Sequence, residues 1–435
     1  MSHATPTPPT GPVAHSERAS RTGPAAHSER APRTAPVAHS ERAPRTAPVA
    51  HTSLRTLVGR SDIARIVLGW GAFGALLFAH PLLAAPAPAA VLVIGLVAIV
   101  AVILACAFGV VKQAEALAHR LGDPYGSLVL TLSIVLIEVI LISAVMLGPG
   151  AHQTIARDSV MAVAMIIMNL VIGLALLLGG MRHRGLQHNR TGTSAYLAML
   201  VLLVTLAFGL PALIGADGSY TIAQAIPVVI LTLGVYAFFL ARQMGAQASD
   251  FTEVGADTER NASKPETRAH STRSDPSILA TLRSHRLEVL VRLALLVVTV
   301  LPIVLLSHDL AALLDDGLGR LGAPPALAGL LIAAIVFLPE SITAVRAALS
   351  AEAQRVNNLC HGALVSTVGL TIPAVLVIGM LTGQTVVLAE SPANMLMLGA
   401  TLLLSVTTFS ARRVTATHGA THLMLFAAYL IVLFS

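Results

Sequence analysis

The sequence predicts an all-α polytopic membrane protein of about eleven transmembrane helices, arranged as one lone helix and two inverted five-helix repeats. Three observations support this prediction. Of the 435 residues, 55% are hydrophobic and only 11% are charged, whereas soluble domains average about 25% charged residues. Several apolar runs exceed the roughly 20 residues that a spanning helix needs. Two of these runs carry a lone glutamate near the middle, and each glutamate follows a similar segment.

The apolar runs divide the chain into four parts. Residues 1–60 form a basic tail that repeats with a period of twelve residues, and its Pro-, Ser- and Arg-rich composition predicts disorder. Residues 61–242 hold the lone helix and the first repeat, residues 243–286 a polar cytoplasmic linker, and residues 287–435 the second repeat. The expected spans lie near 64–85, 89–111, 125–148, 159–180, 195–215, 220–242, 287–307, 324–348, 356–380, 385–408 and 417–434.

Basic residues predict the orientation in the membrane. With the N-terminus in the cytoplasm, the inner loops hold most of the arginines, and the outer loops hold mainly aspartates, as the positive-inside rule requires. An odd number of helices then places the C-terminus outside. We therefore expect a multi-pass protein of the cell inner membrane or plasma membrane. The net charge of +6 comes mostly from the tail and the short loops, so it does not indicate nucleic-acid binding.

The segments before the two glutamates indicate an internal repeat. Ala118-His-Arg-Leu-Gly-Asp-Pro124 precedes Glu138, and Leu318-Gly-Arg-Leu-Gly-Ala-Pro324 precedes Glu340. Each unit has five crossings, an odd number, so the second copy enters the membrane the other way up. Inverted repeats with a polar midplane site are typical of secondary transporters. The sequence lacks a Gly-x-x-x-x-Gly-Lys-Ser/Thr motif, so the expected driving force is an ion gradient.

The candidate cation site combines two carboxylates with neutral oxygen ligands. An ionisable group in the bilayer costs roughly 3 kcal/mol on insertion scales, so Glu138 and Glu340 at matching positions indicate a shared function. Ser127 and Thr131 share a helical face with Glu138 because they precede it by eleven and seven residues. Pro339 can leave a backbone carbonyl free beside Glu340. The remaining candidate ligands are Asn169, Ser341, Ser366 and Thr367.

This set of hard oxygen donors suits Ca²⁺ or Na⁺. Two carboxylates neutralise one Ca²⁺, and they can equally hold protons because burial favours the neutral acid. Cation and protons then compete for the same oxygens, which gives exchange. We expect no enzyme activity and no cofactor, since His-Glu-x-x-His and Gly-x-Ser-x-Gly motifs are absent from the sequence. A channel would need an open polar path, whereas these helices are mostly apolar on every face.

Three segments carry a resemblance to a known family. They are residues 126–142 (GSLVLTLSIVLIEVILI), 338–349 (LPESITAVRAAL) and 356–373 (VNNLCHGALVSTVGLTIP). The chain resembles the calcium/cation antiporter superfamily, in its ChaA-type branch of Ca²⁺/H⁺ and Na⁺/H⁺ exchangers. The resemblance implies eleven helices, with Glu138 and Glu340 carrying the cation and the protons. It also implies a polar partner at Asn169 and, in the second half, at Ser366 or Thr367.

The two glutamate segments depart from one pattern of the superfamily. Its vacuolar-type members carry Gly-Asn-x-x-Glu, whereas this chain has Ile134-Val-Leu-Ile-Glu138 and Val336-Phe-Leu-Pro-Glu340. The missing asparagines leave the choice of cation open. Ca²⁺/H⁺ exchange is the favoured interpretation, and Na⁺/H⁺ or K⁺/H⁺ exchange is the alternative. The expected partners are this cation, H⁺ and the lipid bilayer.

Overall fold

The computed structural model describes residues 58–83, 88–121, 125–146, 153–253, 286–324 and 326–435. Nearly all of the N-terminal tail and most of the expected linker lie outside these ranges, so the predictions for both stay predictions. Residues 52–435 form one compact unit, and its described part is helical, with isolated bridges but no strand.

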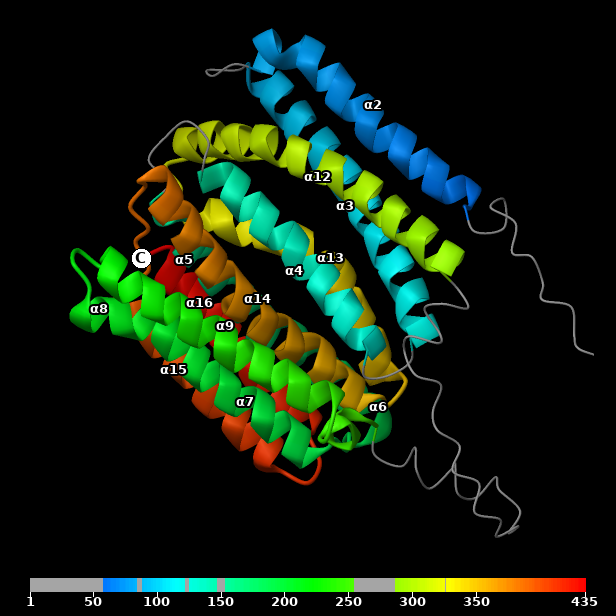
Figure 1. The fold of residues 1–435 in the computed structure, drawn as a ribbon, viewed down its shortest axis with the longest axis vertical. Coiled ribbons are helices and arrows are strands. Elements are labelled where there is room, and N and C mark those ends of the chain that lie inside the picture. Colours follow the sequence, from blue (N-terminus) through cyan, green and yellow to red (C-terminus); the bar gives the residue numbers. More distant parts are fainter. Residues whose placement is uncertain (1–57, 84–87, 122–124, 147–152, 254–285, 325) are drawn as a thin grey trace, which may run out of the picture. The chain divides into compact units, whose positions relative to one another are not determined.

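Each of the eleven expected spans corresponds to one helical run of the described residues (Figure 1). Ten of these runs are long and apolar enough to cross a membrane, and α4, with 22 residues and Glu138 as its only charged residue, has a similar composition. The all-α polytopic fold is therefore confirmed. The runs are α2 (Arg60–Leu83), α3 (Ala89–Leu121), α4 (Tyr125–Met146), α5–η1–α6 (Ile155–Met165, Ile166–Val171, Ile172–His183), α7–η2–α8 (Arg190–Val204, Thr205–Gly209, Leu210–Ile214), α9 (Ile222–Met244), α12 (Arg286–Arg320), α13 (Ala326–Leu349), α14 (Ala353–Thr382), α15 (Pro392–Ser410) and α16 (Ala416–Leu433). A short 3₁₀ turn, η3 (Ala248–Phe251), follows α9.

Local sequence explains where several helices begin and end. The side chain of Asn189 accepts the backbone N–H groups of Thr191 and Gly192 and starts α7, as expected of an N-cap residue. The hydroxyl of Ser391 caps α15 in the same way, with proline at the first helical position. Gly383 adopts a left-handed conformation (φ 71°) and ends α14. These polar caps satisfy terminal backbone groups that would otherwise lack partners.

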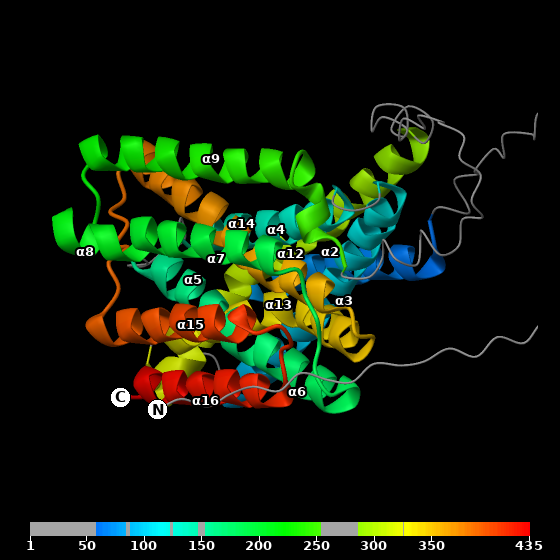
Figure 2. The same cartoon turned by 90° about the horizontal axis from the view of Figure 1, so that it is seen from below.

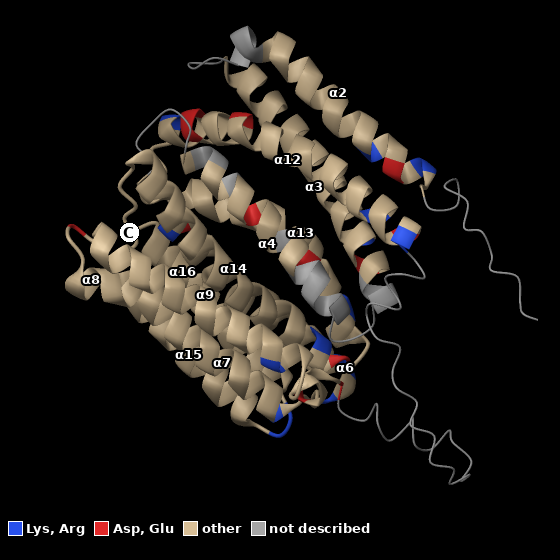
Figure 3. Ribbon diagram, in the orientation of Figure 1, with Lys and Arg blue, Asp and Glu red and all other residues tan. Residues whose placement is uncertain are grey.

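Contacts between loops define two ends of the helices. At one end Leu186 pairs with Val414 through two backbone hydrogen bonds, and the ring of His183 contacts the carbonyl of Leu349. We call this the basic end, because loops 181–190 and 411–414 carry five arginines and no acidic residue. At the opposite end the amide of Val387 donates to Gln153. Figure 3 shows charged residues gathered mostly near the helix ends, with acidic positions also within α4 and α13.

The two glutamate helices run in opposite directions. α13 ends at the basic end, since the carbonyl of Leu349 contacts His183 there. α12 precedes α13 and crosses in the opposite direction, so α12 begins at the basic end. There Arg292, near the start of α12, donates to Gln113 in the last third of α3, and α4 follows α3, so α4 also begins at the basic end. This antiparallel relation is the arrangement that an inverted repeat requires.

Two runs form the interior of the bundle. Buried side chains dominate α5–η1–α6 and α14, whereas helices such as α2 and α16 have few fully buried side chains, as in lipid-facing helices. In both views α14 lies beside α4 and α9, with which it packs (Figures 1 and 2). Glycine permits the closest helix approach: a Cβ added at Gly419 on α16 would lie 2.3 Å from the backbone nitrogen of Leu177 on α6.

Candidate cation site

Glu138 is held inside the bundle by a threonine from the second repeat. Its side chain, 3% exposed, lies on α4. The hydroxyl of Thr367 on α14 donates to Oε2 of Glu138 at 2.5 Å, and Oε1 has no hydrogen-bond partner among the described residues. A hydroxyl donating to a carboxylate forms a short, strong hydrogen bond. The sequence placed both residues among the candidate ligands, and the structure brings them into contact.

Glu340 is equally buried and has fewer partners. It lies on α13 and is 5% exposed, and neither carboxylate oxygen has a hydrogen-bond partner within the described ranges. Its electrostatic neighbours are Glu115 on α3 and Cys360 on α14. Neither Glu138 nor Glu340 forms an ion pair with a described arginine or lysine.

A buried, unpaired carboxylate is costly when it is ionised. The penalty is several kcal/mol per ion even after the protein relaxes, and a neighbouring acid such as Glu115 adds to it. Such a group is stable when it carries a proton or when a bound cation neutralises it. Two such carboxylates, on two antiparallel helices, can therefore alternate between protonated and cation-bound states.

A small cavity joins the helices that carry the two glutamates. Ile137, which precedes Glu138, lines it from α4, and Pro339, which precedes Glu340, lines it from α13. Its volume is about 10 Å³, at the lower limit for holding one water molecule. All seven of its lining residues are apolar, so the cavity offers a cation no side-chain oxygen.

Polar side chains of α14 face two different helices. Ser366 accepts a hydrogen bond from the hydroxyl of Tyr236 on α9 at 2.9 Å, next to Thr367, which bonds to Glu138. The buried hydroxyl of Thr371 has no partner among the described residues. Sequence reasoning missed Tyr236, and its only signal is a tyrosine within the mostly apolar residues 222–244.

The hydroxyl groups of α13 donate hydrogen bonds to backbone carbonyls of the same helix. Ser341 donates to the carbonyl of Phe337 at 2.7 Å, and Thr343 donates to the carbonyl of Pro339 at 3.1 Å. α13 also continues through Pro339, so the unwinding that proline allows does not occur. The freed carbonyl is that of Ile335, which would accept from residue 339 if that residue had an N–H. Ser341 and Thr343 therefore bond to carbonyls other than the one that proline frees.

The structure places Asn169 in a different polar network from the glutamates. Asn169 lies in the π-helical segment η1 and is fully buried. Its amide nitrogen donates to Thr401 on α15 at 2.8 Å, and its amide oxygen is 3.3 Å from Nδ1 of His422 on α16. Nε2 of His422 contacts the hydroxyl of Thr408 at 3.2 Å. Neither this pairing nor the π-helix could be predicted from the sequence.

Two further candidates lie on α4. Ser127 and Thr131 fall within Tyr125–Met146, but their side chains lie outside the described part of the structure. Among the described residues there is no group of three or more His, Cys, Asp or Glu side chains that could hold a metal ion. A cation at this site would therefore depend on the two glutamates together with neutral oxygens.

A polar segment at the basic end caps the start of α14, the helix that carries Thr367. The carboxylate of Glu253 accepts the backbone N–H groups of Gln354 and Arg355 in the first turn of α14, a stabilising position for a negative charge. Burial raises the pKa of Glu253, and these backbone hydrogen bonds oppose that shift. Phe251, two residues earlier, is buried against the ring of Tyr196. Sequence reasoning placed Glu253 in a solvated linker, and these contacts show that its carboxylate is instead a partner of α14.

Comparison with known proteins identifies relatives across most of the chain. The family described as "Sodium/calcium exchanger protein" matches residues 91–245 and 291–435. The "Sodium-potassium/proton antiporter ChaA" of Escherichia coli (strain K12) is 33% identical over 349 residues, which cover 79% of this chain and 90% of that protein. Both matches include the segments that carry Glu138 and Glu340.

Solved structures share the fold at low sequence identity. The native structure of YfkE has a TM-score of 0.59 and 15% identity, covering 85% of this chain and 99% of that chain. The crystal structure of the H⁺/Ca²⁺ exchanger CAX has a TM-score of 0.60 and 15% identity, covering 85% of this chain and 87% of that chain. At this identity the likeness concerns the fold alone.

Proposed function

The chain belongs to the sodium/calcium exchanger protein family, and we propose that it exchanges protons for a metal cation at a site built on Glu138 and Glu340. One observation carries the proposal: each repeat places a carboxylate inside the bundle, and neither is neutralised by a described basic residue. Because a buried charge of this kind needs a counter-charge, protons and a cation are alternative occupants of the same oxygens.

The exchange follows from the charge of the site. The site carries no net charge when both glutamates are protonated, when Ca²⁺ is bound to both carboxylates, or when one Na⁺ or K⁺ is bound and the other glutamate is protonated, and a neutral site is buried at low cost. The empty, doubly ionised site is much less stable when buried, so the change between inward-open and outward-open states occurs only when the site is loaded. Each pH unit across the membrane contributes about 1.36 kcal/mol per proton to the opposing cation movement.

The bond from Thr367 has a specific part in this cycle. Its hydroxyl hydrogen points to Oε2 of Glu138, so its lone pairs are free to face a cation bound beside the carboxylate. Ser366, the residue before it, accepts from Tyr236. We infer that Thr367 orients Glu138 and supplies a neutral ligand, while Tyr236 fixes the rotation of this part of α14.

We infer that the first cations to test are Na⁺ and K⁺. The relative with 33% identity and 90% coverage carries the name sodium-potassium/proton antiporter, whereas the solved structures named as Ca²⁺/H⁺ exchangers share 13% and 15% identity. Neither glutamate segment has the asparagine of the Gly-Asn-x-x-Glu pattern, which removes a neutral oxygen that Ca²⁺, with six to eight ligands, would use. Ca²⁺ is the second candidate, because two carboxylates match its charge.

Antiport in proteoliposomes tests the function. The full chain would be reconstituted with an imposed pH gradient, and Na⁺, K⁺ or Ca²⁺ would be added separately while a trapped dye reports internal pH. We expect Na⁺ or K⁺ to dissipate the gradient. A cation that leaves the gradient standing is not a substrate, and failure of all three would refute cation/proton exchange.

Matched variants test the site. Glu138→Gln and Glu340→Gln keep the side-chain volume but cannot exchange a proton, so each is expected to reduce exchange by at least about 100-fold, as removal of an essential group does. Glu352→Gln is the control, since Glu352 is exposed at the basic end and pairs with Arg355. Near-normal exchange by either site variant would show that the paired-carboxylate site is wrong.

A further inference from the structure

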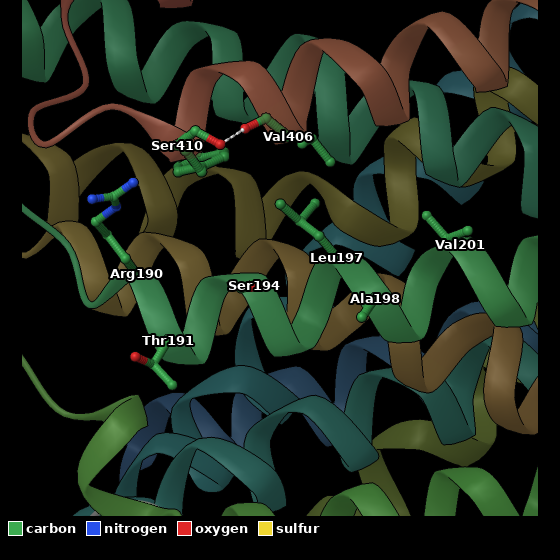
Figure 4. Close-up of a pocket in the computed structure, with 9 residues that line it drawn as sticks. Arg190, Thr191, Ser194, Leu197, Ala198, Val201, Val406 and Ser410 are labelled. Carbon is green, nitrogen blue, oxygen red and sulfur yellow. Dashed lines mark hydrogen bonds between the residues drawn. The ribbon is translucent and has the colours of Figure 1, made fainter.

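A groove on the membrane-facing side of the bundle begins at the basic end. It has a volume of about 600 Å³ and lies between α7 and α15 (Figure 4). Helix α7 lines it with Arg190, Thr191, Ser194, Leu197, Ala198 and Val201, and α15 lines it with Val406, Phe409 and Ser410. The α7 residues recur with helical spacing, so they form one stripe along that helix.

The groove changes from charged to apolar along its length. Arg190 and Ser410 lie at its basic end, the hydroxyls of Thr191 and Ser194 follow, and apolar side chains such as Val201 line the rest. Arg190 and Val201 are eleven residues apart on α7–η2, about 16 Å at 1.5 Å per residue. Half of a bilayer's hydrocarbon core is about 15 Å. The groove therefore spans about one leaflet, with a cation at the level of the headgroups.

The charge at this end is unbalanced. Loops 181–190 and 411–414 carry five arginines and no acidic residue, and backbone hydrogen bonds between Leu186 and Val414 hold the loops together. The guanidinium of Arg190 makes no ion pair or hydrogen bond with the described residues, although it is near His188. The nearby Asp250 approaches α7 through its backbone oxygen, beside Gly192. An anionic group would supply the missing counter-charge.

The floor of the groove is part of the folded core. Phe409 and Leu197 are buried, and the carbonyl of Phe409 contacts the ring of His188 at 3.0 Å. The ring of Phe409 also packs edge-on against that of His361 on α14. By contrast Ala198, Val201 and Val406 are exposed on the walls. A molecule in the groove would thus contact apolar side chains that are already held in place by the packing of the bundle.

We propose that this groove binds a phospholipid with an anionic headgroup, whose phosphate contacts Arg190 and whose acyl chain lies along Leu197, Ala198 and Val201. Basic side chains at a membrane surface attract anionic lipids with about 1 kcal/mol each, and guanidinium groups match the geometry of phosphate oxygens. The apolar walls of the groove distinguish a lipid from a soluble anion, because a free phosphate would not use them.

Lipid titration of the purified full chain tests the proposal. Thermal unfolding in detergent would be followed while dioleoyl phosphatidylglycerol, dioleoyl phosphatidylcholine or chain-free glycerol phosphate is added. We expect phosphatidylglycerol to raise the unfolding midpoint, and the other two to raise it far less. Equal effects of the two lipids would overturn the role of the anionic headgroup. An equal effect of glycerol phosphate would overturn the role of the acyl chain.

Variants locate the effect in the groove. Arg190→Gln is expected to raise the half-saturating phosphatidylglycerol concentration about fivefold, the equivalent of one basic contact, and Arg190→Lys should largely restore it. Ala198→Phe fills the groove and is expected to abolish the lipid response. Arg60→Gln is the matched control, because Arg60 is an exposed arginine at the start of α2, outside the groove. If Arg190→Gln and Ala198→Phe both titrate like the unmodified protein, the lipid is bound elsewhere and the proposal is wrong.

Discussion

Replacing Thr367 by valine tests the bond that joins the two repeats at the candidate site. The substitution keeps the branched shape but removes the hydroxyl that donates to Glu138 at 2.5 Å in a fully buried setting. A hydrogen bond to a charged group contributes about 1.5–3 kcal/mol, which corresponds to about 10- to 150-fold in an equilibrium constant. We therefore expect the apparent KM for the cation to rise by at least about tenfold.

The pH dependence gives this prediction a second measurement. Without its donor, the ionised form of Glu138 is less favourable relative to the protonated form, so protons compete better with the cation. The rise in KM should therefore be larger at low pH than at high pH. Initial rates of cation-induced pH-gradient collapse in proteoliposomes, measured over a range of cation concentrations and at several pH values, supply both quantities.

Two neighbouring substitutions serve as controls. Thr367→Ser retains the hydroxyl and should stay close to the unmodified protein. Thr371→Val removes an equally buried hydroxyl one turn along α14 that has no partner among the described residues, so its KM should change little. The reasoning is refuted if Thr367→Val transports with an unchanged KM at every pH, or if Thr371→Val has the same effect.

Three other predictions concern stability, measured by thermal unfolding in detergent. Burial raises the pKa of Glu253, so its contribution to stability is present below its unfolded pKa of about 4.3 and is lost as pH rises through the higher folded value. Glu253→Gln should reduce this loss of stability with rising pH. An unchanged dependence of the unfolding midpoint on pH would show that Glu253 does not cause it. Asn169→Ala removes the buried hydrogen bonds to Thr401 on α15 and His422 on α16 and should cost about 1–3 kcal/mol with little change in cation KM. A large change in KM would instead make Asn169 a ligand. Gly419→Val would place Cβ 2.3 Å from the nitrogen of Leu177 and should destabilise the protein by more than about 1–3 kcal/mol, whereas Gly399→Val, with open space around it, should not.

The positions of the helices could be predicted because length and hydropathy suffice for them. Each expected span from 64–85 to 417–434 falls on a helical run, since a chain in lipid must satisfy its backbone groups internally. The antiparallel relation of α4 and α13 followed from counting five crossings per repeat. Pro339 shows the limit of local reasoning, because α13 continues through it and hydroxyls of the same helix bond to nearby carbonyls.

The candidate site could be predicted in its charges but not in its contacts. Glu138 and Glu340 stood out because an acid inside an apolar run is expensive wherever it lies. The direction of Asn169 toward His422, and of Thr367 toward Glu138, could not be read from spacing. Helical periodicity says which residues share a face, but the rotation of that face within the bundle depends on partners more than 200 residues away.

The sequence by itself determined the membrane-spanning helices, their alternation between the two ends and the two acidic positions, because each depends on the transfer of a residue between water and lipid. Only the tertiary structure decided that α14 supplies the partner of Glu138, that Asn169 faces α15 and α16, and that Glu253 caps α14. Those contacts depend on how closely helices approach, as at Gly419, and this is a property of the packed bundle rather than of any one segment.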